Sequence, residues 1–309
     1  MIHRGNDYDV SSRINTTDPR VVNDEIDRIY LDLYPSAPSG QIDRAFHDLA
    51  QLYRGEFPGY RACDTAYHDM QHALDATLAM ARLIDGYERA RIGTEPFGES
   101  LFRLGVITAL FHDMGYVRER DDHTHDNGAE YSLTHVSRGS HFLRTYLPTI
   151  GMADMADIAA ELIHFTGDET PLGKINVPSP IYRLLGSMLG SADIIAQMSD
   201  RCYLEKCRDR LYPEFVAAGL ASTRTPEGVE QVVFASGEDL VIKSPEMFRG
   251  AARRLNIDLA GCYTYAQPHF GGQNLYLEEF NKNWKFAAGF SNDADTTMLK
   301  RKPPGTLKP

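Results

Sequence analysis

Residues 101–115 read LFRLGVITALFHDMG, and this stretch decides which class of fold the chain can adopt. Its apolar residues are so nearly continuous that a helix formed here must be buried, and Gly115 follows where a C′ glycine would end it. The adjacent His112 and Asp113 then lie inside the protein. Burying a carboxylate is costly unless a cation or hydrogen-bond donors meet it. The stretch therefore predicts a helical core with a polar site at the end of one of its helices.

The same helical pattern extends through most of the chain. In residues 21–34, for example, apolar side chains recur at 22, 26, 29, 30 and 33, which is the spacing of one helical face. With the Gly and Pro residues between segments, this pattern predicts helices at about 21–34, 41–53, 68–90, 99–114, 127–146, 152–165, 179–199 and 201–218. Alternation over 230–242 predicts one short hairpin, and the tail from 292 is expected to be disordered or draped over the protein.

This pattern predicts an all-α protein with a single domain overall. We expect an N-terminal helical arm over 1–60, a helical core over 61–220, and a C-terminal helical extension over 221–309 packed on the core. The first 17 residues are polar and are expected to form a loose arm without the apolar segment of a signal peptide.

Composition limits the partners and the compartment. The 309 residues carry a net charge of −11, which disfavours duplex nucleic acid because neutralising phosphates needs clustered Lys and Arg. No segment reaches the ~18 consecutive apolar residues of a membrane span, so no membrane partner is expected. Four cysteines without a CxxC pair are typical of free thiols in a reduced, cytoplasmic protein. The sequence carries no signal for the oligomeric state, so a homodimer stays open.

Further polar residues occur where helices must face the core. His72 shares a helical face with apolar residues at 76, 79, 80 and 83, and Asp193 shares one with apolar residues at 185, 189 and 196. Together with His112 and Asp113, they make two buried acids and two buried imidazoles. A metal site explains all four, and imidazole with carboxylate suits Fe, Mn, Zn or Ni.

The order His72 … His112-Asp113 … His135 … His164 … Asp193 resembles the H…HD…H…H…D motif of the HD superfamily of metal-dependent phosphohydrolases. The stretch HVSRGSHFL (135–143) is similar to the HxxxG stretch of binuclear members, and AAELIHFTGD (159–168) lies where those members supply the next histidine. The resemblance covers residues 67 to about 200. It implies an HD-domain helical bundle with N- and C-terminal helical extensions.

The resemblance also implies a ligand set. One or two divalent metal ions (Fe, Mn, Mg, Zn or Ni) would bind, and Asp113 would be shared between them and take part in catalysis. The first ion would be held by His72, His112, Asp113 and Asp193, and the second by Asp113, His135 and His164. Two ions that share a ligand lie about 3.5–4 Å apart, and such a pair can activate water and bind a phosphoryl oxygen.

His68 is implied as a catalytic residue by a more distant likeness. YHDMQHA (67–73) is similar to the YHNxxHA stretch of cyclic-nucleotide phosphodiesterases, in which the first histidine is a general acid and the second a metal ligand. The alternative is that His68 only supports the metal ligands. Two departures limit the substrate: Tyr116 stands where these phosphodiesterases have the last histidine of HDxxH, and HFTGDETPLG (164–173) replaces the GYP signature of cyclic-di-GMP hydrolases.

These features imply a phosphomonoesterase or phosphodiesterase that acts on a nucleotide or another small phosphorylated substrate through a metal-activated hydroxide. Two other classes stay open: an HD-type diiron oxygenase, similar to the inositol oxygenase family, and a non-catalytic nucleotide-binding sensor. His123 and His125 lie in a polar loop that is either solvated or a substrate lid. The basic residues near the site are either phosphate ligands or surface charges: Arg118, Arg120, Arg138, Arg144 and Lys174.

Overall fold

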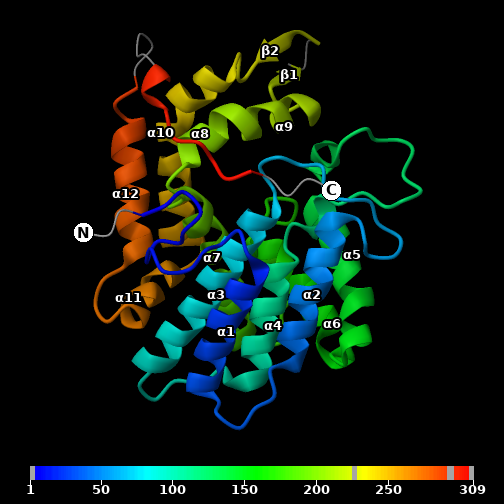
Figure 1. The fold of residues 1–309 in the computed structure, drawn as a ribbon, viewed down its shortest axis with the longest axis vertical. Coiled ribbons are helices and arrows are strands. Elements are labelled where there is room, and N and C mark those ends of the chain that lie inside the picture. The colour runs from blue at the N-terminus through cyan, green and yellow to red at the C-terminus, as the bar shows by residue number, and fades with distance from the viewer. Residues whose placement is uncertain (1–3, 225–227, 291–295, 306–309) are drawn as a thin grey trace.

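The computed structural model describes residues 4–224, 228–290 and 296–305, and these residues are predominantly helical (Figure 1). This confirms the all-α prediction. The helices are α1 (Pro19–Leu33), α2 (Gly40–Arg54), α3 (Met70–Ala90), α4 (Gly98–Leu110), α5 (His135–Tyr146), α6 (Ala156–Leu162), α7 (Pro180–Met198), α8 (Tyr203–Lys206), α9 (Tyr212–Ala217), α10 (Gly237–Arg253), α11 (Ala266–His269) and α12 (Leu275–Ala287). Within the described residues, the sheet is one antiparallel pair, β1 (Ser222–Arg224) and β2 (Glu230–Val232).

Helix α3 lies at the centre of the fold. Its residues from Met70 to Tyr87 are buried almost without exception, and it packs against α1, α4, α7 and α11. It begins two residues later than the sequence pattern predicts, because Asp69 is extended and caps the helix. Since α3 is covered over most of the length from Met70 to Tyr87, a buried polar residue in this part of the helix reaches bulk water only through a cavity.

The end of α4 differs from the prediction. The helix stops at Leu110, so His112 and Asp113 lie in the following turn rather than on the helix. The prediction that Gly115 ends this helix as a C′ glycine is wrong, because α4 already ends at Leu110 and the φ of Gly115 is not positive. A glycine is needed here for a different reason: a Cβ at Gly115 would lie 1.8 Å from the carbonyl oxygen of His135. The turn therefore packs directly against the start of α5.

Three other predicted elements have different bounds. The helix expected over 127–146 is divided into a 3-10 turn (Gly128–Tyr131) and α5, and the one over 152–165 is shortened to α6 between 3-10 turns. The hairpin predicted over 230–242 is wrong, because β2 pairs with the preceding β1 and α10 already begins at Gly237. Ser236 caps α10 by accepting a hydrogen bond from Asp239 N, a local signal that outweighs the alternation.

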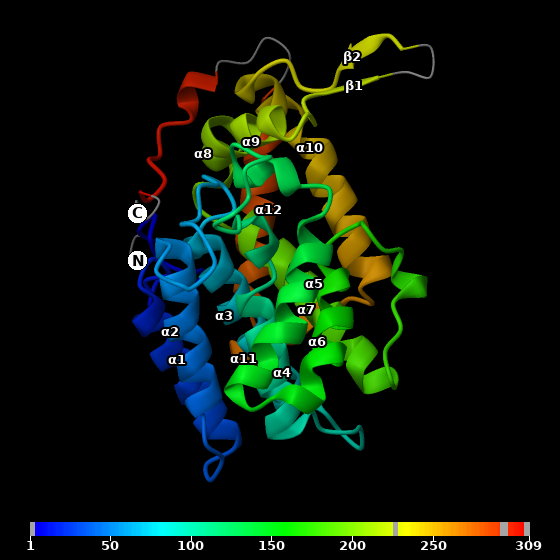
Figure 2. The same cartoon turned by 90° about the vertical axis from the view of Figure 1, so that its right-hand side faces the viewer.

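The two ends of the chain are packed on the helical core. The loose arm expected at the N-terminus is wrong for the described residues from 4 onward, because Asp9 and Val10 are buried and Asp9 pairs with Arg82 of α3 at 2.6 Å. The segment 296–305 is draped over the protein and buries Leu299. Helices α8–α10 and the hairpin lie at one end of the molecule, and the hairpin projects from it (Figure 2).

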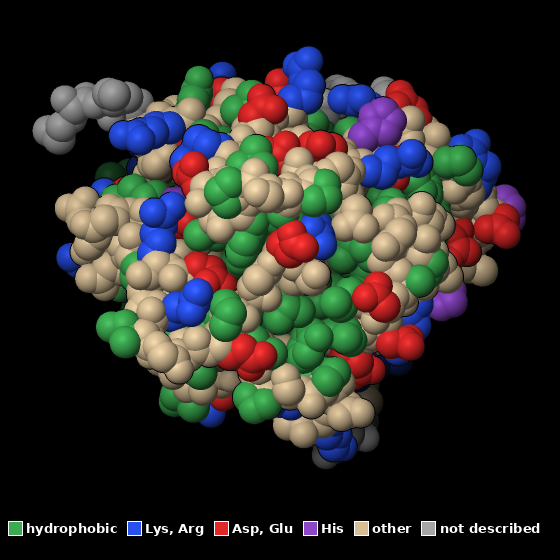
Figure 3. Space-filling view, turned by 90° about the horizontal axis from the view of Figure 1, so that it is seen from below, with side chains coloured by type: hydrophobic (Ala, Val, Ile, Leu, Met, Phe, Trp, Pro, Cys, Tyr) green, Lys and Arg blue, Asp and Glu red, His purple; other side chains and the backbone are tan. Residues whose placement is uncertain are grey.

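The opposite end of the helical core brings apolar side chains to the surface among scattered charges (Figure 3). Ile92, in the α3–α4 connection, is 93% exposed. Within the described parts of the chain, every helix falls short of the length and apolar character that crossing a bilayer requires.

Candidate metal centre

His72 lies in the first turn of α3, where its position is fixed by the cap of the helix. Asp69 Oδ1 accepts a hydrogen bond from His72 N at 3.0 Å. Asp69 is held in turn by Arg210, whose Nη1 lies 3.1 Å from Oδ2. The His72 side chain is only 6% exposed. The local sequence Asp-Met-Gln-His therefore both starts the helix and places an imidazole in the core.

His112 and Asp113 approach His72 from the turn after α4. His112 Nδ1 lies 2.8 Å from the carbonyl oxygen of Ala109, which assigns a proton to Nδ1 and makes Nε2 the nitrogen that can bind a metal ion. This Nε2 lies 3.2 Å from His72 Nε2. Asp113 Oδ2 lies 3.2 Å from His72 Nε2 and 3.3 Å from His112 Nε2. Three potential ligand atoms thus converge on one buried point.

Asp193 reaches the same point from α7. Its Oδ1 lies 3.2 Å from His72 Nε2 and 3.6 Å from His112 Nε2. Gln197, one turn later on α7, donates a hydrogen bond to this oxygen at 3.1 Å and so orients the carboxylate. Tetrahedral ligands bound at about 2.1 Å lie roughly 3.4 Å apart, so the separations among His72, His112 and Asp113, and those from Asp193 to the two imidazoles, match ligands of one ion.

Three of the atoms that meet at this point are not satisfied by donors or acceptors of the surrounding protein. Asp113 Oδ2 is buried and has no hydrogen-bond partner, and the two Nε2 atoms face each other. An unsatisfied carboxylate oxygen in the interior is costly. The buried group of His72, His112 and Asp113 can hold a metal ion, and Asp193 would complete a set of two nitrogens and two oxygens. Such a set suits Zn, Fe, Mn or Ni.

The charges of this cluster link metal binding to proton release. Burial lowers the pKa of His72, but the carboxylates of Asp113 and Asp193, each 3.2 Å from its Nε2, outweigh this effect and raise the pKa to about 9. Burial raises the pKa of Asp113, yet the charge of His112 holds it well below its usual value. A metal ion must therefore displace protons from the imidazoles, and metal affinity is expected to fall at acid pH.

His68 lies beside the cluster and is paired with Glu214 of α9. Its Nδ1 lies 2.6 Å from Glu214 Oε2, while Glu214 Oε1 accepts a hydrogen bond from Tyr67 N at 2.5 Å. Burial lowers the pKa of His68, but the charge and hydrogen bond of Glu214 outweigh it and raise the pKa. The pair holds a proton on Nδ1 and leaves Nε2 for a ligand. The sequence analysis missed Glu214, because it is 146 residues from His68 and no local pattern links them.

Tyr116 is stacked between two imidazoles of the candidate site. Its ring lies 4.2 Å from that of His68 and 4.4 Å from that of His135, with interplanar angles of 16° and 19°. His135 Nδ1 lies 2.9 Å from the carbonyl oxygen of Ser132, so its Nε2 lone pair is free. Burial lowers the pKa of His135, which keeps the ring neutral at pH 7. Tyr116, which stands where the phosphodiesterases have a histidine, therefore fixes the ring planes of His68 and His135.

His164 is placed differently from the other predicted ligands. It lies in the 3-10 turn Ile163–Phe165, with its Nδ1 3.3 Å from Thr170 Oγ1. Asp113 and His135 line the cavity above the cluster, whereas His164 is not among the described residues that line it. A second ion held by these three residues stays a prediction.

The cavity above the cluster has a volume of about 420 Å³ and an acidic lining. Four carboxylates line it: Asp113, Asp168, Glu169 and Asp193. Among its described lining residues there is no Lys or Arg. The basic residues considered as phosphate ligands lie elsewhere, and Arg138, for example, donates to the carbonyl oxygens of Gly115 and Val117. His123 and His125 do not line the cavity either. An anion would therefore be attracted by a bound ion and by protonated His68 alone.

One wall of the cavity, residues 165–169, is held from two sides. Glu169 accepts hydrogen bonds from two backbone nitrogens in the first turn of α5, at 2.8 and 3.0 Å. Arg254, in the π-helical turn after α10, donates to two carbonyl oxygens of the wall at 3.1 and 2.9 Å and pairs with Asp168. The C-terminal part of the chain thus positions a wall of the site.

Three comparisons, with models of protein families, with curated proteins and with solved structures, found no match to this chain.

Proposed function

We propose that the protein is a metal-dependent phosphoester hydrolase of the HD type that acts on a small phosphorylated substrate. The observation that supports this most directly is the convergence of His72, His112, Asp113 and Asp193 on one buried point that opens to a cavity. A divalent ion held there supplies a Lewis acid that activates water and polarises a phosphoryl oxygen.

The residues beside the cluster suit proton transfer to a leaving group. Glu214 keeps His68 protonated, because its carboxylate accepts the hydrogen bond from Nδ1 and stabilises the imidazolium. Tyr116 packs against the ring and fixes its plane. His68 Nε2 is then the group that donates a proton to the leaving oxygen, as a general acid does.

The charge of the cavity favours one of the two reactions that the sequence leaves open. Four carboxylates and no lining Lys or Arg leave little positive charge beyond that of an ion. A phosphodiester carries one negative charge, whereas a phosphomonoester carries nearly two at pH 7. A diester with an alkoxide leaving group also needs the proton that His68 holds. Phosphodiester cleavage is therefore our preferred reaction.

The test combines metal content with turnover in the full-length protein purified without oxygen. We expect a stoichiometric divalent ion and hydrolysis of bis(p-nitrophenyl) phosphate faster than of p-nitrophenyl phosphate. Asp113→Ala should lose both the metal and the activity, while the control Asp157→Ala, at a side chain 92% exposed, should keep both. Wild-type metal content in Asp113→Ala would refute the metal site, and a metal-loaded protein without hydrolysis of any phosphoester would refute the reaction.

The same preparations decide how many ions bind. If His135 and His164 hold a second ion, His135→Ala and His164→Ala should each lower the metal count from two towards one, with non-additive effects on turnover. A count of one in the wild type and in both variants would make the enzyme mononuclear. Iron with consumption of O₂ would instead identify the oxygenase alternative.

A further inference from the structure

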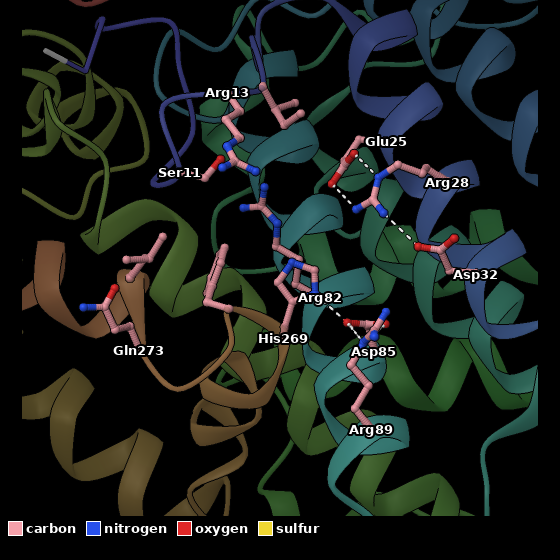
Figure 4. Close-up of a pocket in the computed structure, with 13 residues that line it drawn as sticks. Ser11, Arg13, Glu25, Arg28, Asp32, Arg82, Asp85, Arg89, His269 and Gln273 are labelled. Carbon is pink, nitrogen blue, oxygen red and sulfur yellow. Dashed lines mark hydrogen bonds and ion pairs between the residues drawn. The ribbon is translucent and has the colours of Figure 1, made fainter. Parts of the chain in front are cut away.

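A second cavity, of about 630 Å³, lies where the N-terminal arm meets α1, α3 and residues 269–275 (Figure 4). Its lining contains the guanidinium groups of Arg13, Arg28, Arg82 and Arg89. It is separate from the metal centre: Arg82 and His72 are ten residues apart on α3, which places their backbones about 15 Å apart. None of its lining residues takes part in the proposed phosphoester hydrolysis.

Arg82 is a buried cation whose hydrogen bonds are incomplete. Only 1% of the residue is exposed, and its Nη2 lies 2.6 Å from Asp9 Oδ2 while Nη1 donates to Tyr276 Oη at 3.0 Å. Its guanidinium lies over the ring of Phe270, with 5.1 Å from Cζ to the ring centroid. The Nε atom is buried and has no hydrogen-bond partner. A lining cation with an unsatisfied donor is one feature of an anion site.

Arg13 is the second such group. Its side chain is exposed, and its guanidinium has no ion-pair or hydrogen-bond partner among the described residues. Figure 4 shows the guanidinium groups of Arg13 and Arg82 pointing toward each other across the cavity. Asp9 offsets the charge of Arg82, whereas no carboxylate in the described part of the chain offsets that of Arg13, so an anion between the two guanidinium groups would gain from the charge of Arg13 and from the unsatisfied Nε of Arg82.

The remaining arginines of the cavity differ from this pair. Arg28 is held between Glu25 and Asp32, with 2.8 Å to each, and Arg89 pairs with Asp85 at 2.7 Å. Their charges are already neutralised within the protein. Arg82 is also paired, with Asp9, so the uncompensated positive charge of the cavity lies at Arg13, and Arg82 contributes its unsatisfied Nε donor.

We infer that this cavity binds a small oxyanion, the phosphate or carboxylate group of a metabolite, between Arg13 and Arg82. Guanidinium groups bind such oxygens through paired, charge-assisted hydrogen bonds. His269 lines the same cavity, and because its Nδ1 lies 2.6 Å from Asp85 Oδ2, its Nε2 is the nitrogen left for the ligand. The site joins the N-terminal arm to α3, so an occupied site would stabilise the docking of the arm.

The test is isothermal titration of the full-length, metal-loaded protein with sulfate, inorganic phosphate and succinate, at constant ionic strength set with NaCl. We expect saturable binding of at least one oxyanion, and Arg13→Gln should weaken it about tenfold or more. Arg20→Gln is the matched control, because it removes one exposed arginine of the same N-terminal region outside the cavity and should leave the affinity unchanged. Phosphate and succinate as separate arms distinguish a phosphate ligand from a carboxylate ligand.

A second variant, Asp113→Ala, tests whether the oxyanion binds at the metal centre instead. Asp113→Ala should bind the oxyanion as the wild type does, whether or not the protein proves to be a hydrolase. Equal affinity in the wild type and Arg13→Gln, or loss of binding in Asp113→Ala alone, would overturn the inference. So would the absence of saturable binding by all three anions.

Discussion

The pairing of His68 with Glu214 leads to the sharpest prediction. Glu214→Gln keeps the size of the side chain and removes its charge. The Gln Oε1 can still accept from Tyr67 N, which turns the amide nitrogen toward His68 Nδ1. An amide donates where the carboxylate accepted, so the variant favours a neutral imidazole with its proton on Nε2. The pKa of His68, which Glu214 raises in the wild type, should therefore fall.

The size of the effect follows from the contact that is lost. A hydrogen bond to a charged group contributes about 1.5–3 kcal/mol, and this one lies between side chains that are only 17% and 5% exposed. Because the pKa of His68 is raised in the folded protein, the stabilisation is present below its ordinary value near 6.5 and is lost as the pH rises through the folded value. Glu214→Gln should thus be most destabilising below pH 6.

The assay is a titration of the histidine side chains by NMR in the zinc-loaded protein, with His68→Gln to assign the resonance. Urea unfolding at pH 5.5 and 8.5 measures the change in stability. If the protein is a hydrolase, the alkaline limb of its pH–rate profile should move to lower pH in Glu214→Gln. An unchanged titration of His68 in this variant would refute the reasoning.

Three further predictions concern packing, pH and the wall of the site. Gly115→Ala should lower the free energy of unfolding by about 1–3 kcal/mol or more in urea titrations, because its Cβ meets a backbone oxygen, whereas Gly173→Ala, with no atom near its Cβ, should not. Burial, followed by the charge of Asp200, raises the pKa of Asp75 to about 7. The free energy of unfolding should therefore fall as the pH rises from about 4 to 7. Asp75→Asn should then stabilise the protein at pH 8, by at most about 4 kcal/mol, and little near pH 4, whereas an equal gain at both would contradict the pKa. Arg254→Met should increase hydrogen exchange in residues 165–169 and change KM without changing metal content. The control Arg253→Met, at a neighbouring exposed arginine, should change neither the exchange nor KM. Unchanged exchange in Arg254→Met would show that the wall does not depend on this arginine.

The features that the sequence predicted are those that produce a periodic pattern of apolar residues or a short motif. The helical core follows from apolar faces that repeat along each segment, and His72 and Asp193 stand out because each replaces an apolar residue on such a face. The structure brings these two residues together with His112 and Asp113. Because burying an unpaired charge is costly, the sequence already indicates that these residues share a site, although it does not give their contacts.

The features that the sequence did not predict depend on contacts between distant segments. Gly115 was assigned to a helix end, because a close approach to His135 leaves no trace in the neighbouring residues. Glu214 was missed for the same reason. The docking of the N-terminal arm uses the buried carboxylate of Asp9, whose partner Arg82 is 73 residues away in the sequence.

The contacts of Arg82 have a consequence for the order in which the chain can fold during synthesis. Its partners Asp9 and Tyr276 are 73 and 194 residues away, so the guanidinium cannot make both of these hydrogen bonds until α12 has left the ribosome. At about 5–20 residues per second, the chain waits roughly 10–40 s between the synthesis of Arg82 and that of Tyr276. During this interval the arm is anchored on one side only and α3 exposes part of the surface that it later buries. Nascent chains halted before α12 should therefore be more readily bound by chaperones and cleaved by proteases than chains released after it.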